Sequence, residues 1–264
     1  MTDRWTVVDR QQQVVSRELA QSEWPWLQVE WRDAPTTRGL FLEWDNAGLC
    51  LKSTEADSRS CLRIDFCDGP QARRLNAVTG EILTRAIGCQ KGLRPSVCDA
   101  TAGLGGDSSV LANVGCWVFA FERSDVVSSL LADALFRARM ADLAWSGRMQ
   151  LKHANAADYV SRLNHGVLYL DPMFPIERRA QPGLAMQLLH QLPETSEAAD
   201  TLFAAAMDSN AARVVVKRPL KAPPLGGREP QSQIRGKAVR FDLYPRRKLT
   251  DADQEPIGFI GLTP

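Results

Sequence analysis

The chain has 264 residues, of which 44% are hydrophobic and 24% are charged, and its formal net charge is +1. These values are typical of a globular protein with one large core. The net charge is too small to attract a polyanion such as a nucleic acid. Contacts with nucleic acid would therefore have to come from local basic groups. No apolar run approaches the roughly 18 residues of a membrane helix, and the six cysteines and three histidines lack metal-ligand spacing. We therefore expect a cytoplasmic, monomeric protein with reduced thiols and no membrane or metal partner.

The first 70 residues contain short segments in which apolar and polar residues alternate, a pattern typical of strands with one exposed face. These segments span residues 5–8, 27–31, 39–44, 48–52 and 62–66. They predict a small antiparallel, β-rich subdomain over residues 1–70. Five of the seven tryptophans lie here. They could form a base-stacking surface or the core of the small sheet, and we favour the core.

From about residue 80, apolar strand-like runs alternate with helical patterns. Predicted strands cover residues 96–100, 117–122, 149–153, 167–170 and 212–217, and predicted helices cover 81–87, 107–114, 125–141 and 156–163, with further helices through about 210. This alternation predicts an α/β domain over residues 71–264 with a parallel, doubly wound sheet. Two late segments, 239–244 and 256–262, indicate a closing antiparallel pair.

A glycine-rich loop follows the first strand of the predicted sheet, at the place where doubly wound folds bind nucleotides. Asp99 ends the strand, Gly103, Gly105 and Gly106 follow, and Asp107 starts a helix. Glycines let the backbone turn tightly and let a ligand approach without a Cβ clash. The spacing matches neither the G-x-G-x-x-G dinucleotide fingerprint nor a G-K-[ST] phosphate loop. The loop therefore indicates a nucleotide-type ligand and disfavours a phosphate-gripping loop.

Two acids refine the identity of that ligand. Glu122 ends the next predicted strand, where a carboxylate can accept both hydroxyls of a ribose, as in sites for NAD or for S-adenosylmethionine. Asp107 at a helix N-terminus would repel a pyrophosphate but not a cationic aminoacyl-sulfonium ligand. It could equally serve as a helix cap. The pair favours S-adenosylmethionine over NAD, so an NAD oxidoreductase is disfavoured.

The segment Asp-Pro-Met-Phe follows the apolar strand at 167–170 and suits the binding of a planar amine. Asp171 and the carbonyl of Pro172 can accept hydrogen bonds from the amine, and the ring of Phe174 can stack on a base. Asp-Pro after a strand is also an ordinary turn signal. The glycine loop and the ribose acid favour the amine-binding interpretation. A base can reach such a pocket only when it is unpaired or flipped out of its helix.

Five blocks in order resemble the class I S-adenosylmethionine-dependent methyltransferases: D-A-T-A-G-L-G-G-D, F-E-R-S, H-A-N-A, Y-L-D-P-M-F-P and V-V-V-K-R-P. More narrowly, residues 62–244 resemble the rRNA small subunit methyltransferase J family, which methylates a guanine N2 of 16S ribosomal RNA. The resemblance implies a Rossmann-like, mostly parallel seven-stranded sheet with helices on both faces, S-adenosylmethionine as cofactor, and small-subunit ribosomal RNA or the assembled subunit as partner.

The resemblance also assigns cofactor-contacting positions to seven residues: Gly106, Asp107, Glu122, Arg123, Asn155, Ala156 and Asp171. Two of these blocks depart from the family pattern. The family usually has Arg where Gly106 stands, and a Ser-Ser pair where Asn155 and Ala156 stand. Asn155 can still hydrogen-bond an adenine edge, whereas Ala156 offers only its backbone.

Local basic pairs predict the contact with RNA phosphates. The candidates are the basic groups Arg73-Arg74, Arg178-Arg179, Lys217-Arg218, Arg235/Lys237 and Arg246-Arg247-Lys248. We favour Lys217 and Arg218, which end a buried strand beside the pocket. Two other functions remain open from the residues alone. One is methylation of another planar amine, such as adenine N6 or a protein glutamine. The other is a catalytically weakened module that binds the cofactor or RNA, which the departures at 106 and 156 motivate.

Overall fold

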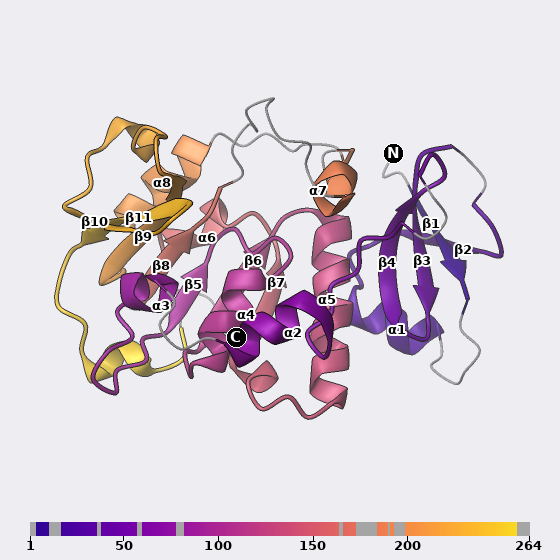
Figure 1. The fold of residues 1–264 in the computed structure, drawn as a ribbon, viewed down its shortest axis with the longest axis horizontal. Helices are drawn as coiled ribbons and strands as arrows, with labels where there is room; N and C mark the ends of the chain where they lie inside the picture. The colour runs from indigo at the N-terminus through magenta and orange to yellow at the C-terminus, as the bar shows by residue number, and fades with distance from the viewer. Residues whose placement is uncertain are drawn as a thin grey trace.

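The computed structural model contains two β-sheets, which lie side by side along the long axis of the molecule (Figure 1). The structure describes residues 4–10, 17–35, 38–56, 60–77, 82–163, 166–172, 184–189, 191–192 and 199–257. In these residues no helix is long and apolar enough to cross a membrane.

The larger sheet has seven strands in the order β10-β11-β9-β8-β5-β6-β7. The strands are β5 (Val97–Asp99), β6 (Val118–Glu122), β7 (Met149–His153), β8 (Val167–Leu170), β9 (Arg213–Pro219), β10 (Ser232–Arg235) and β11 (Val239–Pro245). Strands β5 to β9 are parallel, and β10 and β11 are antiparallel. The chain progresses outward on one side from β5 to β7, then returns to the other side of β5 with β8. This reversal is the switch point at which doubly wound sheets bind ligands, and it confirms the predicted fold class.

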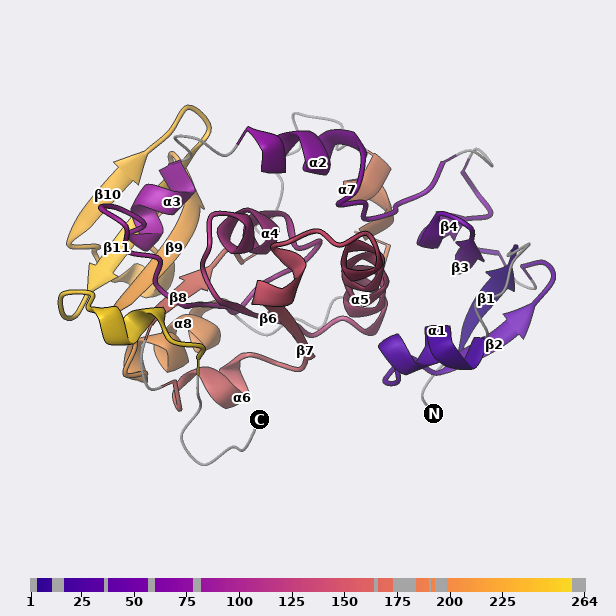
Figure 2. The same ribbon diagram turned by 90° about the horizontal axis from the view of Figure 1, so that it is seen from below.

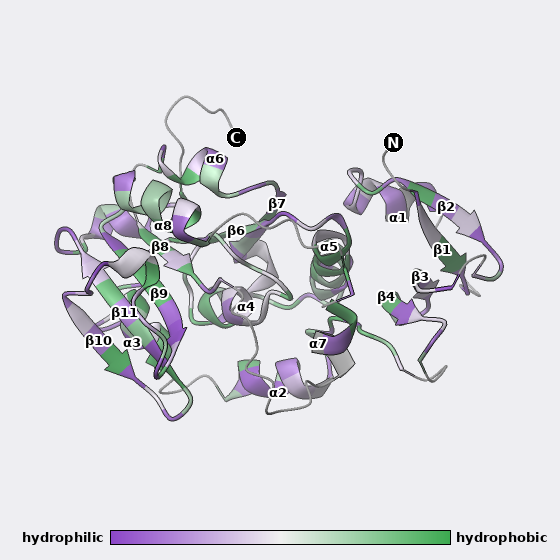
Figure 3. Cartoon of the chain, turned by 90° about the horizontal axis from the view of Figure 1, so that it is seen from above, coloured by the Kyte–Doolittle hydropathy of each residue, from purple (hydrophilic) through white to green (hydrophobic). Residues whose placement is uncertain are grey.

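Helices cover both faces of this sheet (Figure 2). On one face lie α4 (Gly106–Asn113) and α5 (Asp125–Met140), and on the other lie α6 (Ala157–Val160) and α8 (Ala199–Asp208). Alternate strand residues supply the two cores: Val215 packs on the α4 side, and Val214 and Val216 pack on the α8 side. Apolar residues run along α5, and Figure 3, which views this helix end-on, colours it mainly hydrophobic.

The smaller sheet has the order β2-β1-β3-β4, with strands β1 (Trp5–Asp9), β2 (Val29–Arg32), β3 (Leu40–Asp45) and β4 (Gly48–Ser53). The predicted antiparallel pairing is correct only for β3 with β4, because β1 is parallel to both β2 and β3. The connection from β1 to β2 contains α1 (Arg17–Glu23), and such a helical crossover is what parallel neighbours need. The predicted strand 62–66 is wrong, since only a single bridge joins Leu62 to Leu51.

Tryptophans of the smaller sheet form its core, as predicted. Trp24 and Trp44 are buried, and Trp31 lies between them with ring centroids 6.0 and 5.6 Å away. Trp26 instead reaches the larger sheet, where it stacks on His153 and donates a hydrogen bond to Ser129 Oγ at 3.1 Å. The first 56 residues therefore pack against the strand ends that hold the candidate site.

The closing strands differ from the prediction. The partner of β11 is β10, which the sequence did not signal, and residues 256–257 form no strand, while 258–264 lie outside the described residues. The predicted helix 156–163 shortens to α6. The remaining elements are α2 (Gly69–Asn76), α3 (Ile82–Ile87), α7 (Leu184–Leu189) and three short 3-10 turns, η1 (Ser146–Arg148), η2 (Leu225–Gly227) and η3 (Asp251–Gln254).

Candidate active site

The predicted cofactor residues lie in a row along the carboxyl edge of four adjacent strands. Asp171 follows β8, Asp99 ends β5, Glu122 ends β6, and Asn155 follows β7. Because the strand order is β8-β5-β6-β7, these side chains span three inter-strand spacings, roughly 14 Å. An extended ligand can therefore contact all four positions at once.

The loop from β5 to α4 requires two of its glycines. Gly103 and Gly105 have φ angles of +53° and +73°, in the left-handed region that favours glycine. A Cβ atom on Gly105 would also lie 2.6 Å from Leu131 Cδ1. Gly105 is the N-cap of α4 and offers no side chain to its first turn, so backbone N–H groups at this helix start lie beside the site.

Asp99 is buried beneath this loop. Its Oδ2 accepts a hydrogen bond of 2.5 Å from Ser108 Oγ, and its Oδ1 accepts one of 3.1 Å from the Thr101 backbone N–H. Burial raises the pKa of Asp99 to about 7, against the opposing effect of these two donors. The carboxyl group therefore anchors the loop to α4 and sits under the place where a ligand would enter.

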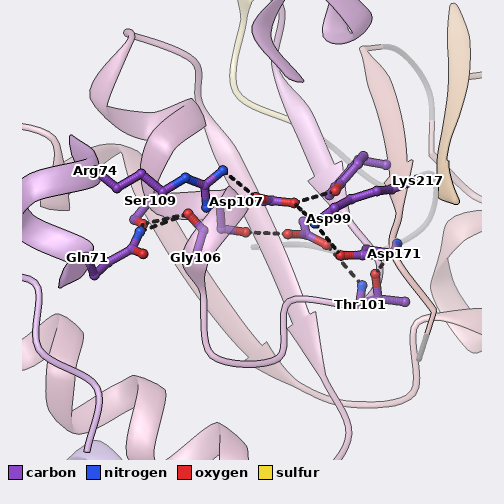
Figure 4. Close-up of polar contacts among 11 residues, drawn as sticks. Gln71, Arg74, Asp99, Thr101, Gly106, Asp107, Ser109, Asp171 and Lys217 are labelled. Atoms are coloured by element: carbon purple, nitrogen blue, oxygen red, sulfur yellow. Dashed lines mark hydrogen bonds and ion pairs between the residues drawn. The ribbon is translucent and has the colours of Figure 1, made fainter. Parts of the chain in front are cut away.

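Lys217 joins two acids of the site, Asp107 and Asp171 (Figure 4). Lys217 Nζ lies 2.9 Å from Asp107 Oδ2 and 2.7 Å from Asp171 Oδ2. Tyr169 donates its hydroxyl to the same oxygen of Asp107 at 2.5 Å, and the Asp171 backbone N–H donates to Thr101 Oγ1 at 2.6 Å. The network fixes Asp171 against the glycine loop, as the sequence predicted, through a lysine that the sequence did not signal in this role.

Strand alternation explains why these side chains meet. Val97, Val167 and Val215 all pack in the core on the α4 side. Residues two positions further along each strand point to the same face, so Asp99, Tyr169 and Lys217 also face α4. Asp107 meets them from the first turn of that helix.

The charges in this cluster shift one another. Burial raises the pKa of Asp171, and the Lys217 ammonium partly offsets this rise. For Asp107, burial is outweighed by Lys217, by the Tyr169 hydroxyl and by Arg74, so its pKa lies below the usual value. Burial lowers the pKa of Lys217, but the two carboxylates outweigh it and the net pKa is raised. Lys217 and Asp107 are therefore charged at neutral pH.

Asp107 does not cap α4, one of the roles open to it from sequence; its carboxylate faces Lys217, Tyr169 and Arg74. Arg74 comes from α2, which packs on α4, and its Nη2 lies 2.7 Å from Asp107 Oδ1. Its Nη1 lies 3.5 Å from where a Cβ on Gly106 would stand. Gln71 of the same helix donates to Gly106 O at 3.0 Å. Thus α2 places a cation over the glycine loop (Figure 4).

Glu122 is held by the backbone at the end of β6. Its Oε2 accepts from the Gly103 N–H at 2.9 Å, and its Oε1 accepts from the Ser124 N–H at 2.7 Å. Burial raises its pKa despite these donors and the adjacent Arg123. A carboxylate has about four acceptor sites and these backbone donors do not occupy them all, so Glu122 can still accept a hydroxyl donor.

The residues after β7 extend the row. Asn155 Oδ1 accepts from the Ala157 N–H at 3.1 Å, which leaves the amide Nδ2 as its donor. Ala156 is buried at the start of α6. Arg123 is exposed, and its carbonyl lies 3.2 Å from His153 Nε2. The contact of Asn155 and Ala156 with the edge of a purine stays a prediction.

The interpretation of Lys217 and Arg218 as phosphate contacts needs correction. The Lys217 ammonium is bonded to two carboxylates, and Arg218 is buried, with Nε and Nη2 donating to Pro223 O at 3.0 and 2.5 Å. Strand adjacency, which brings β9 beside β8, placed Lys217 in the site. Pro172 is buried next to Asp171. Phe174, Arg178 and Arg179 lie outside the described residues.

Within the part of the chain that the structure describes, no group of three or more His, Cys, Asp or Glu side chains is arranged to hold a metal ion. The six cysteines are free thiols. The described side chains around the glycine loop include carboxylates, a lysine and an arginine.

Comparisons with known proteins agree with this geometry. The family described as "Putative SAM-dependent methyltransferase" matches residues 27–246. Ribosomal RNA small subunit methyltransferase J of Stutzerimonas stutzeri is 40% identical over 216 residues, covering 79% of this chain and 84% of that protein. The protein of that name from Thioalkalivibrio sulfidiphilus is 42% identical over 214 residues, covering 78% and 84%.

A solved structure supports the same assignment. The crystal structure of a SAM-dependent methyltransferase from Neisseria gonorrhoeae superimposes with a TM-score of 0.71 and 28% sequence identity, covering 94% of this chain and 98% of that one. The strand-end acids, the glycine loop and the extent of these matches agree. The chain belongs to the SAM-dependent methyltransferases, in the family of the ribosomal RNA small subunit methyltransferases J.

Proposed function

We propose that this protein transfers a methyl group from S-adenosylmethionine to the exocyclic N2 amine of a guanosine in small-subunit ribosomal RNA. The observation that carries the proposal is Asp171, held by Lys217 and Thr101 at the switch point beside the glycine loop. The names of the relatives support the RNA substrate. A cytoplasmic location and a monomeric state stay predictions.

The donor set fits the cofactor. The ligand has a zwitterionic amino-acid end, a cationic sulfur and a ribose. The site offers the carboxylates of Asp107 and Asp171, the cation of Arg74, and Glu122 at one sheet edge, while Asp99 supports the glycine loop from beneath. When bound, S-adenosylmethionine supplies an activated methyl group. Gly103 leaves the approach open, because a Cβ placed there would meet only Thr101 O at 3.9 Å.

Asp171 orients the amine in the proposed mechanism. Its carboxylate and the Pro172 carbonyl accept the two N–H groups, so the nitrogen lone pair is aimed at the methyl donor. Held near-attack geometry can lower a barrier by several kcal/mol, up to ~7–11. Phe174 is predicted to stack on the base for roughly 1–3 kcal/mol. No proton needs to leave before transfer. The excess proton of the methylated nitrogen would pass afterwards to the Asp171 carboxylate or to solvent, so Asp171 is ionised in the active form.

Two alternatives receive less support. Adenine N6 and a glutamine amide would also suit an Asp-Pro acceptor pair, but the relatives at about 40% identity carry the name of a ribosomal RNA enzyme. A binding module without activity would need no acceptor pair for an amine, whereas Asp171 and Pro172 offer one beside the glycine loop. An NAD enzyme would bring a pyrophosphate toward Asp107.

Replacing Asp171 with Ala should reduce methyl transfer by about a hundredfold or more, because misplacement of the amine alone costs on that order. Small ribosomal subunits from a strain lacking the enzyme serve as substrate, and mass mapping locates the methyl group. The control is Asp208→Ala, which removes an exposed carboxylate from the end of α8. Turnover by Asp171→Ala equal to that of the control would refute the orienting role.

Replacing Lys217 with Met should move the acid limb of the kcat-against-pH profile to higher pH. The active form of Asp171 is the carboxylate, and Lys217 opposes the rise in its pKa that burial and Asp107 cause. Without the ammonium, Asp171 is protonated at higher pH, so activity falls first at mildly acidic pH and recovers as pH rises. Tyr169, Asp99 and Arg74 also face the cluster and are unchanged in the variant.

The conservative variant Lys217→Arg keeps the positive charge and should keep the wild-type acid limb. A loss of activity by Lys217→Met that is the same at every pH would point to a purely structural lysine. A change in the salt dependence of RNA binding, with the pH profile unmoved, would instead restore the phosphate-contact interpretation.

Replacing Arg74 with Gln should weaken S-adenosylmethionine binding about tenfold, equivalent to ~1.4 kcal/mol. The reason is that α2 holds this guanidinium over the glycine loop, where it can pair with the carboxylate of the cofactor. Decarboxylated S-adenosylmethionine keeps the sulfonium and the ribose, so its affinity should not change in the same variant. Calorimetry measures both ligands without turnover.

Two further variants make this comparison specific. Arg73→Gln removes an exposed charge from the same helix and should alter neither affinity. Glu122→Gln should weaken both ligands equally, because both carry the ribose. If Arg74→Gln also lost affinity for the decarboxylated ligand, the arginine would be acting through Asp107 rather than on the carboxylate.

A further inference from the structure

Positive charge is concentrated in one segment of the chain. Residues 213–248 contain eleven Lys and Arg against two Asp and Glu, a net charge of +9, so the rest of the chain carries −8 for a total of +1. This segment forms β9, β10 and β11, which lie at the opposite end of the molecule from the smaller sheet (Figure 1). The total charge is therefore near zero although positive and negative charges are unevenly distributed along the chain.

The strand register brings part of this segment to the edge of the sheet that holds the site. Lys217 in β9 pairs with Phe241 in β11, which pairs with Ile234 in β10. Ile234 therefore lies two inter-strand spacings, roughly 10 Å, from Lys217, and Arg235 is the next residue along β10. The turn between β10 and β11 and the connection that leaves β9 both lie at this carboxyl edge.

Buried arginines shape this edge. Arg240 pairs with Asp242 through two hydrogen bonds of 2.8 and 3.0 Å, and its Nη1 donates to Pro219 O and Leu220 O. Arg218 holds Pro223 O. The connection after β9 is thus tied at both ends, so the residues it carries are presented from a fixed backbone rather than from a loose loop.

Three exposed basic side chains lie at the carboxyl edge: Lys221 on the connection, and Arg235 and Lys237 at the β10–β11 turn. The turn is closed by a Gly236 N–H to Val239 O hydrogen bond of 2.8 Å and packs on α3, where Ile82 Cδ1 fills the space of a Cβ on Gly236. Arg235 donates to Gln233 Oε1, a neutral acceptor, at 2.8 Å. Their positive charges are thus presented to the surface.

The basic residues at the other end of β11 have structural partners. Arg247 makes two hydrogen bonds of 2.7 and 2.6 Å to Asp253, which is buried, and Arg246 donates to Ser209 O at the end of α8. Arg228, Arg246, Arg247 and Lys248 are also exposed toward the amino edge, so what distinguishes Lys221, Arg235 and Lys237 is their place at the carboxyl edge, beside the site.

We propose that Lys221, Arg235 and Lys237, called here the basic edge, bind backbone phosphates of the RNA strand whose target base enters the site. The inference rests on the proposed function and adds the docking surface to it. An RNA backbone is the occupant we favour, because lysine and arginine side chains on a fixed edge suit phosphates and read no sequence. Base specificity would then remain with the Asp171 pocket, while the basic edge sets the register of the strand.

The double variant Arg235→Gln/Lys237→Gln tests the basic edge. Its affinity for an in vitro transcript of small-subunit ribosomal RNA is measured from low to moderate salt. Each lost phosphate contact should lower the slope of log affinity against log salt by about 0.7–0.9, so the double variant should lose roughly 1.4–1.8 of slope. Affinity at low salt should fall about tenfold or more, and S-adenosylmethionine binding should not change.

The matched control is Lys91→Gln/Arg162→Gln, which removes two exposed charges near the amino edge of the parallel strands. Equal losses in the two double variants, wild-type behaviour in both, or a wild-type protein that does not bind the transcript at low salt would overturn the proposal. So would a loss seen only on assembled subunits, which would indicate a ribosomal protein at this edge. Methylation assays on the wild-type protein separate the two ideas, because absent turnover with the expected salt slopes would reject the reaction and retain the docking surface.

Discussion

The arrangement of the site depends on one ammonium group held between two carboxylates. Asp107 and Asp171 come from a helix start and a strand end; Asp107 is largely buried and Asp171 is partly buried, so their mutual repulsion would be costly without a cation. Lys217 supplies that cation at 2.9 and 2.7 Å. A buried pair of this kind contributes little net stability by itself. Its consequence is geometric: it fixes Asp171 relative to the glycine loop, and this sets where an amine can meet a methyl donor.

The sequence predicted which residues form this site better than it predicted which residues lie next to them. Apolar alternation located β5, β6, β8 and β9, and the Asp-Pro step after β8 indicated an acceptor. Strand order was not predictable from local periodicity, since any parallel strand has the same pattern whichever neighbours it has. Lys217 therefore looked like one basic residue among many, and only the adjacency of β9 to β8 shows it bonded inside the site. Arg74 was predicted only as one of several basic groups that could contact RNA, because nothing local in the sequence shows that α2 packs on α4 and brings Arg74 to Asp107.

The smaller sheet shows the same division between local and long-range information. Four of the five predicted strands exist, and the tryptophan core was predicted, yet the direction of β1 relative to its neighbours was wrong. Direction depends on the crossover through α1, and a seven-residue helix carries weak sequence signals. What this sheet contributes to the site is indirect. Trp26 stacks on His153 and bonds Ser129, so it braces the ends of β6 and β7 that hold Glu122 and Asn155.

The two ligands of the proposed reaction impose opposite electrostatic demands on neighbouring surfaces. A sulfonium cofactor favours acids, and Asp99, Asp107, Asp171 and Glu122 are clustered where it would lie; an RNA strand favours bases, and 213–248 carries +9. If the charges were mixed, the acids at the pocket would repel the RNA backbone and the bases would repel the sulfonium. The acids and the exposed bases lie on different strands along the same sheet edge, so both demands are met. Their charges cancel in the total, so a net charge of +1 does not indicate a nucleic-acid substrate. Lys217 lies where the basic segment adjoins the acidic cluster. It belongs to the basic segment in sequence, but its ammonium group pairs with the carboxylates of the cluster.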